Sequence, residues 1–130
     1  MISPLISLMQ DQVTKLQTAG ISADYLGSAQ SQPAKVLDDL EAGLLSVLYV
    51  TPEFIVNKTE SILERIPDHN KICSIAIDES HCVSLWGEDF RDSYRELSKL
   101  KKSFPGVPII ALTATATPRV QADICKERII

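Results

Sequence analysis

Hydrophobic residues in this chain form short continuous runs, separated by segments in which they recur every three or four positions. The continuous runs span residues 44–50, 72–77 and 107–112, and a weaker one spans 23–26. Runs of this length without alternation are typical of strands that are covered on both faces. The periodic segments between them predict helices. The pattern therefore predicts an α/β fold with a mainly parallel sheet and helices on both faces.

A hydroxyl residue followed by proline precedes three of the predicted helices, at Ser3-Pro4, Thr51-Pro52 and Thr117-Pro118. The hydroxyl oxygen is predicted to cap the helix by accepting a hydrogen bond from a first-turn N–H. Proline fits the first helical position, where its missing N–H costs nothing. A strand that runs into a capped helix, repeated along the chain, is the unit of a βαβ fold.

The first predicted helix runs from this cap to Gly20 and is amphipathic. One face carries Leu5, Met9, Val13 and Leu16, and we expect Leu5 and Met9 in the core. Further helices are predicted over residues 34–40, 59–65 and 118–130. The chain has no repeat, no low-complexity segment and no long linker, which predicts one compact unit.

The composition is that of a globular domain of ordinary size. The chain has 130 residues, of which 45% are hydrophobic and 23% charged, and a net charge of -4. No overall basic field points to nucleic acid, so any such contact must come from local patches. Three widely spaced cysteines indicate reduced thiols inside a cell. No apolar run approaches the roughly 20 residues of a membrane span, so no membrane partner is expected.

Both ends of the chain lie within predicted helices or directly beside them. The first helix signal follows only two residues, and the last helix reaches residue 130 without a glycine or asparagine cap. This pattern predicts a piece of a longer polypeptide. A short natural protein with frayed ends is the alternative.

Two adjacent carboxylates, Asp78 and Glu79, follow the strand predicted over residues 72–77. Ligands of open parallel sheets bind beyond the carboxyl ends of the strands. One carboxylate there would hold Mg²⁺ and the other would polarise the water that attacks a nucleotide phosphate. An exposed turn is the alternative interpretation.

A threonine-rich segment with Thr113 and Thr115 follows the next predicted strand, at the same sheet edge. Hydroxyl groups there are expected to hydrogen-bond the carboxylates and to transmit their state. The alternative is a threonine run that merely leads into a helix cap. His81 is either a nucleotide-sensing residue or a polar turn residue, and the lone Cys82 beside it makes a structural zinc site improbable.

An aromatic segment, residues 81–95, lies between these motifs and contains Trp86 and Phe90. Its rings could stack on bases or could pin a loop to the core. In the helix predicted after it, one face is basic and the opposite face is apolar. The basic residues are Arg91, Arg95, Lys99 and Lys102, and the apolar ones are Phe90, Tyr94, Leu97, Leu100 and Phe104. The basic stripe would follow phosphates or would be an ordinary solvated face.

No phosphate-binding loop of the form G-x-x-x-x-G-K-[ST] occurs among the five glycines of this sequence. Without its amides and lysine, we expect triphosphate binding by this chain alone to be very weak.

The order and spacing of these motifs resemble RecQ helicases over essentially the whole chain. The matching segments are residues 3–9 and 11–13 (motif Ia), 49–53 (motif Ib), 78–82 (the DEAH-type motif II), 86–91 (the aromatic-rich loop) and 112–116 (motif III). Residues 26–31 resemble the Werner-type branch. The resemblance implies that residues 1–130 are a partial RecA-like (P-loop NTPase) helicase domain, with motifs Ia to III but without the Walker A region and the second motor domain.

The resemblance also implies roles for single residues. Asp78 would coordinate Mg²⁺ and Glu79 would activate water. His81, in the same motif, is grouped with them as a candidate catalytic residue. Thr113 and Thr115 would couple nucleotide state to DNA, and Ser3 and Thr51 would touch the DNA backbone. Single-stranded DNA would be sensed by Trp86, Phe90 and Arg91, with Arg95 on the basic stripe.

The parent protein implied by the resemblance is an ATP-dependent 3′→5′ DNA helicase of repair or recombination. ATP and Mg²⁺ would be its cofactors, and single-stranded or duplex DNA and the rest of the helicase polypeptide its partners. The Werner-type likeness implies a nuclear location. The 130-residue chain alone is not expected to unwind DNA.

Three positions depart from the family pattern. Ser80 replaces a usual alanine, Leu85 a polar residue and Glu88 a histidine, and Glu88 would bring a negative charge near a DNA phosphate. Two rival functions also stay open: a metal-assisted hydrolase that uses Asp78, Glu79 and His81, and a catalytically silent module that binds DNA or protein.

Overall fold

The structure is a computed structural model that describes residues 1–66, 68, 71–85 and 89–130. It divides into two compact units, residues 1–69 and 70–130, and each unit is described by itself. Among the described residues, no helix combines the length and the apolar character needed to cross a bilayer.

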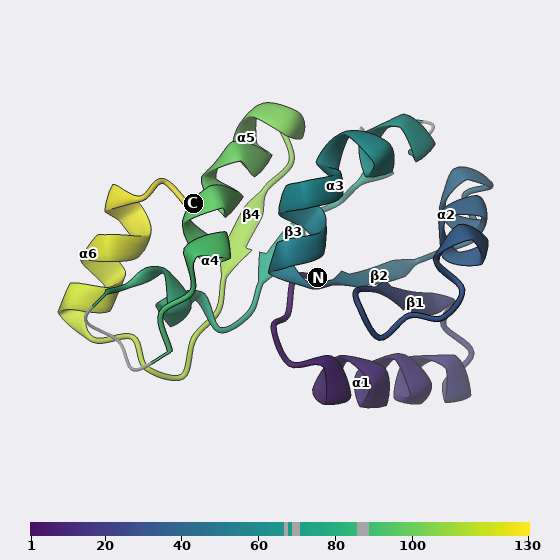
Figure 1. The fold of residues 1–130 in the computed structure, drawn as a ribbon, viewed down its shortest axis with the longest axis horizontal. Coiled ribbons are helices and arrows are strands. Elements are labelled where there is room, and N and C mark those ends of the chain that lie inside the picture. The colour runs from purple at the N-terminus through teal and green to yellow at the C-terminus, as the bar shows by residue number, and fades with distance from the viewer. Residues whose placement is uncertain (67, 69–70, 86–88) are drawn as a thin grey trace. The chain divides into compact units, whose positions relative to one another are not determined.

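The first unit contains a pair of parallel strands and the helices that pack on it (Figure 1). Its described elements are α1 (Ile6–Thr18), β1 (Ala23–Leu26), α2 (Pro33–Glu41), β2 (Val47–Val50) and α3 (Pro52–Arg65). The register of β1 and β2 runs from the pair Ala23–Val47 to the pair Leu26–Val50, and a parallel bridge adds Ile2 beside Val50. The predicted parallel arrangement is confirmed here.

One buried apolar cluster of this unit lies between α1 and the strands. Met9 and Val13 of α1 are buried against Ala23 and Tyr49. The prediction for Met9 is confirmed, but the prediction for Leu5 is wrong, because Leu5 is 44% exposed. The helix begins only at Ile6, so Leu5 is the extended residue before it and does not share the buried helical face.

The three predicted hydroxyl caps have different outcomes. Thr51 accepts a hydrogen bond from the Phe54 N–H and caps α3, and Thr117 accepts one from the Val120 N–H and caps α6 (Pro118–Lys126). Ser3 caps no helix, since α1 begins three residues later. The Ser3 N–H instead donates to the Val50 carbonyl at 3.0 Å, which keeps Ser3 on the sheet.

Two helix boundaries differ from the sequence pattern. The segment predicted as a separate helix at 59–65 continues from the Thr51 cap, with non-helical backbone angles at Lys58. The last helix ends at Lys126 and not at residue 130. Arg128 is left-handed with φ 57°, and the N–H of Ile129 bonds to the Ile124 carbonyl, as at a helix C-terminus.

The second unit contains the parallel pair β3–β4, whose register runs from Ile75–Ile109 to Ile77–Ala111 (Figure 1). Its described elements are β3 (Ile75–Ile77), the 3-10 helix η2 (Ser80–Val83), α4 (Asp92–Glu96), the 3-10 helix η3 (Leu97–Lys99), α5 (Leu100–Ser103), β4 (Ile109–Ala111) and α6.

Strands β2, β3 and β4 are shorter than the apolar runs that predicted them. Leu44 begins its run but lies just beyond α2, where its N–H bonds back to the Asp39 carbonyl. The pairing of β3 and β4 starts where the Ile75 N–H donates to the Pro108 carbonyl. Pro108 has no N–H with which to extend the ladder.

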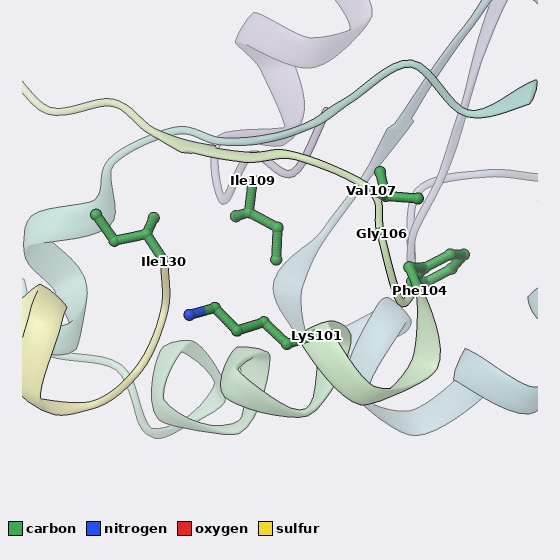
Figure 2. Close-up of a pocket in the computed structure, with 6 residues that line it drawn as sticks. All are labelled: Lys101, Phe104, Gly106, Val107, Ile109 and Ile130. Carbon is green, nitrogen blue, oxygen red and sulfur yellow. The ribbon is translucent and has the colours of Figure 1, made fainter. Parts of the chain in front are cut away.

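The helical segment after the aromatic loop is not one continuous α-helix but α4, η3 and α5 in succession. Tyr94, Leu97, Leu100 and Phe104 are buried, so the predicted apolar face is confirmed at these positions. Phe90 is only half-buried. A hollow of about 280 Å³ lies at the end of α5, where none of the predicted site residues lines it (Figure 2). Its lining residues are Lys101, Phe104, Gly106, Val107, Ile109 and Ile130.

Candidate functional site

The carboxylate pair lies where β3 ends, next to the end of the parallel strand β4. Asp78 directly follows Ile77, and both Asp78 and Glu79 are half-buried. The Ser80 N–H and the Ser80 hydroxyl each donate to the Leu112 carbonyl at 2.9 Å. The turn that carries the carboxylates is therefore fastened to the chain just beyond β4, as the parallel arrangement predicts.

Glu79 has a left-handed backbone, with φ 53° and ψ 38°. This conformation costs a residue with a side chain about 1–2 kcal/mol, so it persists only where neighbouring contacts fix it. The Glu79 N–H donates to Oδ1 of Asp78 at 2.9 Å, and the adjacent Ser80 is fully buried. The turn therefore carries two consecutive carboxylates at one strand end on a backbone that is neither extended nor right-handed helical.

His81 joins the carboxylate turn to the threonine segment. Its Nδ1 lies 2.8 Å from Oγ1 of Thr113, and its Nε2 lies 3.4 Å from Oε2 of Glu79. Oγ1 of Thr113 also accepts from the Thr115 N–H at 3.1 Å and lies 3.3 Å from the Thr115 hydroxyl. A continuous side-chain path therefore runs from Glu79 through His81 to Thr113 and Thr115.

This path corrects one expectation from the sequence. The sequence predicts hydrogen bonds from the threonine hydroxyls to the carboxylates themselves, but Thr113 bonds to the imidazole of His81. The His81 side chain is 10% exposed. Its imidazole can contact Glu79 and Thr113 at the same time because it has a ring nitrogen facing each of them. Nε2 also lies 3.5 Å from Oδ2 of Asp89, so a residue of the aromatic loop reaches the same histidine.

Asp78 is suited to hold a magnesium ion through one of its oxygens. Oδ1 accepts the Glu79 N–H, whereas Oδ2 has no partner among the described residues. Among those residues, no group of three or more histidine, cysteine, aspartate and glutamate side chains is arranged to hold a metal. Mg²⁺ at nucleotide sites needs only one or two carboxylates, because water and phosphate oxygens complete its octahedron.

The aromatic loop is described only in part. Trp86, Gly87 and Glu88 lie outside the described residues, so the structure does not place the predicted stacking tryptophan. At the end of the loop, the Arg91 N–H donates to the Cys82 carbonyl at 2.9 Å, which ties this end to η2.

The basic stripe predicted over residues 91–102 is interrupted. The guanidinium of Arg95 lies 5.3 Å from the centroid of the Phe90 ring, and its Nη1 lies 3.7 Å from Oε1 of Glu127. Lys99 forms an ion pair with Glu96. Both of these cations therefore have partners within the unit. Part of the predicted basic stripe is thus engaged in contacts within the unit.

Ser3 and Thr51 lie together in the first unit. The bridge between Ile2 and Val50 places them after paired residues, and both are buried, with 3% and 6% exposure. The Thr51 N–H donates to the Leu26 carbonyl at 3.2 Å, which ties it to β1 as well. A Cβ atom on the buried Gly27 would lie 2.9 Å from Cγ2 of Thr51, so this turn requires glycine beside the threonine.

Sequence reasoning missed one polar contact of the site. The helical spacing predicts Tyr94 on the apolar core face, but its hydroxyl also donates to the Asp78 carbonyl at 2.7 Å. A buried tyrosine hydroxyl nearly always finds a partner, so a tyrosine on a predicted core face close in sequence to the carboxylates was the available signal.

Comparison with known proteins places the chain in a family. The sequence pattern of the family described as "DEAD/DEAH box helicase" matches residues 1–124. The chain is 52% identical to "ATP-dependent DNA helicase RecQ" of Haemophilus influenzae over 127 residues, which are 96% of this chain and 20% of that protein. It is 47% identical to "ATP-dependent DNA helicase RecQ" of Bacillus subtilis, over 97% of this chain and 21% of that protein.

A third relative is the "Bifunctional 3'-5' exonuclease/ATP-dependent helicase WRN" of Mus musculus, 47% identical over 95% of this chain and 9% of that protein. The chain thus spans about a fifth or less of the length of these relatives. These likenesses confirm the resemblance to RecQ helicases, and the parallel strands agree with a partial RecA-like fold. The chain belongs to the DEAD/DEAH box helicase family.

Proposed function

We propose that the protein containing this chain is an ATP-dependent DNA helicase, and that residues 1–130 form part of its first RecA-like motor domain. Family membership supports the reaction class. The observation that carries the assignment within the chain is the side-chain path from Glu79 through His81 to Thr113. A motor needs such a path, because a change at the nucleotide site must alter the conformation of the residues that bind nucleic acid.

The residues of the turn have distinct roles in this proposal. Asp78 holds Mg²⁺, which when bound neutralises charge on the phosphate oxygens of ATP. Glu79, whose backbone is left-handed, accepts a proton from the attacking water. His81 senses a change at Glu79 through Nε2 and passes it to Thr113 through Nδ1.

DNA contacts are proposed on each unit separately. In the first unit, Ser3 and Thr51 lie together, and the Thr51 hydroxyl at the start of α3 would donate to a backbone phosphate. In the second unit, Trp86, Phe90 and Arg91 would sense single-stranded DNA. Arg95, whose guanidinium lies over the ring of Phe90 and near Glu127, would brace that ring.

The direction of movement and the cellular role are also proposals. We propose 3′→5′ movement, action in DNA repair or recombination and a nuclear location. The relatives include bacterial proteins as well as a mouse protein, so the nuclear location rests on the Werner-type likeness of residues 26–31. Strand displacement from duplexes with either a 3′ or a 5′ single-stranded tail tests the direction. Displacement restricted to the 5′-tailed duplex contradicts it.

Glu79→Gln in the full-length protein tests the proposed chemistry. The amide keeps the shape of the side chain but cannot accept the proton, so ATP turnover should fall by at least about 100-fold while nucleotide binding is retained. Glu60→Gln, an exposed change in α3, is the matched control and should leave turnover unchanged. Turnover by Glu79→Gln at the wild-type rate contradicts the base assignment.

The rivals are separated by two further observations. A metal-assisted hydrolase predicts Mg²⁺- or Mn²⁺-dependent turnover by the 130-residue chain without ATP, whereas a helicase motor predicts none. A silent binding module predicts that the coding sequence upstream of this chain also lacks a Walker A loop. Reading that sequence is the simplest test.

A further inference from the structure

Tyr94 occupies an unusual position for a core residue, because its hydroxyl reaches the carboxylate turn from another element. Tyr94 lies on α4 and is fully buried. Its hydroxyl donates at 2.7 Å to the carbonyl of Asp78, sixteen residues earlier. A buried phenol that lost this acceptor would leave two groups unpaired, so the contact fixes both elements strongly.

The Asp78 carbonyl is a sensitive point on the backbone. The β3–β4 ladder ends with the Leu112 N–H donating to the Ile77 carbonyl, so Asp78 is the first residue that the sheet does not hold. The carbonyl of Asp78 and the N–H of Glu79 belong to one rigid peptide plane. Tyr94 holds the carbonyl end of this plane and Oδ1 of Asp78 holds the N–H end.

The orientation of that plane bears on both carboxylates, because Oδ1 of Asp78 accepts a hydrogen bond from its N–H and the Glu79 side chain follows it. A rotation of the plane changes ψ of Asp78 and φ of Glu79 together, and φ of Glu79 has the unusual value of 53°. Without the hydrogen bond from the tyrosine hydroxyl, this peptide plane could rotate, and φ of Glu79 could then return to the negative values that are usual for residues with a side chain. The Glu79 side chain would then move relative to His81.

Tyr94 also connects this plane to the end of the aromatic loop. The Tyr94 N–H donates to the Arg91 carbonyl at 3.1 Å, so Tyr94 lies in the first turn after Phe90 and Arg91. A displacement of these loop residues would be carried by α4 to the Tyr94 hydroxyl. This connection is separate from the contact between Asp89 and His81, which acts on a side chain rather than on the backbone.

We propose that Tyr94 is a positioning residue for ATP hydrolysis, which holds the peptide plane between Asp78 and Glu79 and links it to the aromatic loop. The inference rests on the proposed function, because it concerns how the carboxylates of that site are aimed. Tyr94 touches no reacting group. It acts through the backbone of the residues that do.

Tyr94→Phe in the full-length protein is the direct test, since it removes the hydroxyl and keeps the ring. Loss of one hydrogen bond corresponds to a factor of about 5–10, so we expect kcat for ATP to fall about 5- to 10-fold with little change in KM. We also expect a smaller stimulation of ATPase by single-stranded DNA, and a higher Mg²⁺ concentration for half-maximal rate.

Two control variants separate positioning from mere stability. Tyr25→Phe, in the first unit, makes the same chemical change and loses a 3.1 Å hydrogen bond with Nε2 of Gln10. Thr18→Val, also in the first unit, removes an exposed hydroxyl that donates to the Thr14 carbonyl at 2.9 Å. Both controls should keep kcat and the stimulation by DNA within about twofold of wild type at temperatures well below the melting point.

The outcomes distinguish this inference from the proposed function. A Tyr94→Phe protein that melts at a lower temperature, yet keeps the kcat, Mg²⁺ dependence and DNA stimulation of wild type, overturns the positioning role and leaves the helicase proposal intact. If Tyr94→Phe folds poorly, the ratio of the DNA-stimulated to the basal ATPase rate is measured on the folded fraction. A ratio below that of wild type supports the positioning role, and an unchanged ratio overturns it. A wild-type protein without DNA-stimulated ATP turnover refutes the proposed function itself.

Discussion

At the end of β2 the chain enters α3 through a threonine cap, whereas at the end of β3 it enters η2 through a left-handed glutamate. The first junction follows local rules, because Thr51 accepts the Phe54 N–H only three residues away and Pro52 begins the helix. The second junction depends on distant residues, since Tyr94 and Leu112 hold Asp78 and Ser80.

The difference shows which residues fix the backbone conformation of each junction. The helix cap at Val50–Pro52 is made by residues of the junction itself, and the sheet contact of the Thr51 N–H with the Leu26 carbonyl adds to it. The backbone conformation at Glu79 is unfavourable in isolation and is maintained by the contacts around it. Strained conformations of this kind are common at functional sites. The comparison predicts that substitutions at the two junctions will change the free energy of unfolding by different amounts and in opposite directions.

The largest expected effect lies at the first junction, at Gly27. A methyl group there would come within 2.9 Å of Cγ2 of Thr51, so Gly27→Ala should lower the free energy of unfolding by about 1–3 kcal/mol. Thr51→Ser removes Cγ2 and keeps the capping oxygen, and should restore most of the loss in the double variant. Urea denaturation of the four proteins in a double-mutant cycle measures the coupling. Strict additivity would show that the two groups do not collide.

A smaller effect is expected from the cap itself. Thr51→Ala should cost about 1 kcal/mol of unfolding free energy, because the Phe54 N–H loses its acceptor. Thr117→Ala, at the cap of α6, should cost a similar amount. Ser3→Ala should cost less than about 0.5 kcal/mol, since Ser3 caps no helix. Equal losses at positions 3 and 51 would argue against the observed start of α1.

The smallest effect, of opposite sign, is expected at the second junction. Glu79→Gly relieves the left-handed backbone and should raise the free energy of unfolding by up to about 1 kcal/mol, while ATP turnover is lost. Glu60→Gly within α3 is the matched control and should lower it by about 1 kcal/mol. If both glycine variants are destabilised alike, the strain assigned to position 79 is absent.

The sequence predicted the parts of this structure that follow local rules. Apolar runs located β1 to β4, and the Thr-Pro pairs located the starts of α3 and α6. The same rule failed at Ser3, because its backbone N–H is bound by the Val50 carbonyl, a partner 47 residues away. Capping propensity is a local tendency that sheet pairing overrides here.

The candidate site was predicted less completely for the same reason. The positions of Asp78, Glu79 and Thr113 beyond parallel strands could be expected, but the bridge through His81 joins residues 32 positions apart. The basic stripe assumed 100° per residue along one α-helix. The 3-10 geometry at η3 advances about 120° per residue and changes which side chains share a face.

Cys82, the residue after the bridging histidine, has a consequence for chemical handling of the protein. Its thiol is 2% exposed, and burial raises its pKa to about 11. At neutral pH it is almost entirely protonated and is a poor nucleophile towards alkylating reagents and oxidants. Cys73 and Cys125 are exposed. Maleimide probes at neutral pH should therefore attach to the latter two cysteines and leave the neighbour of His81 unlabelled.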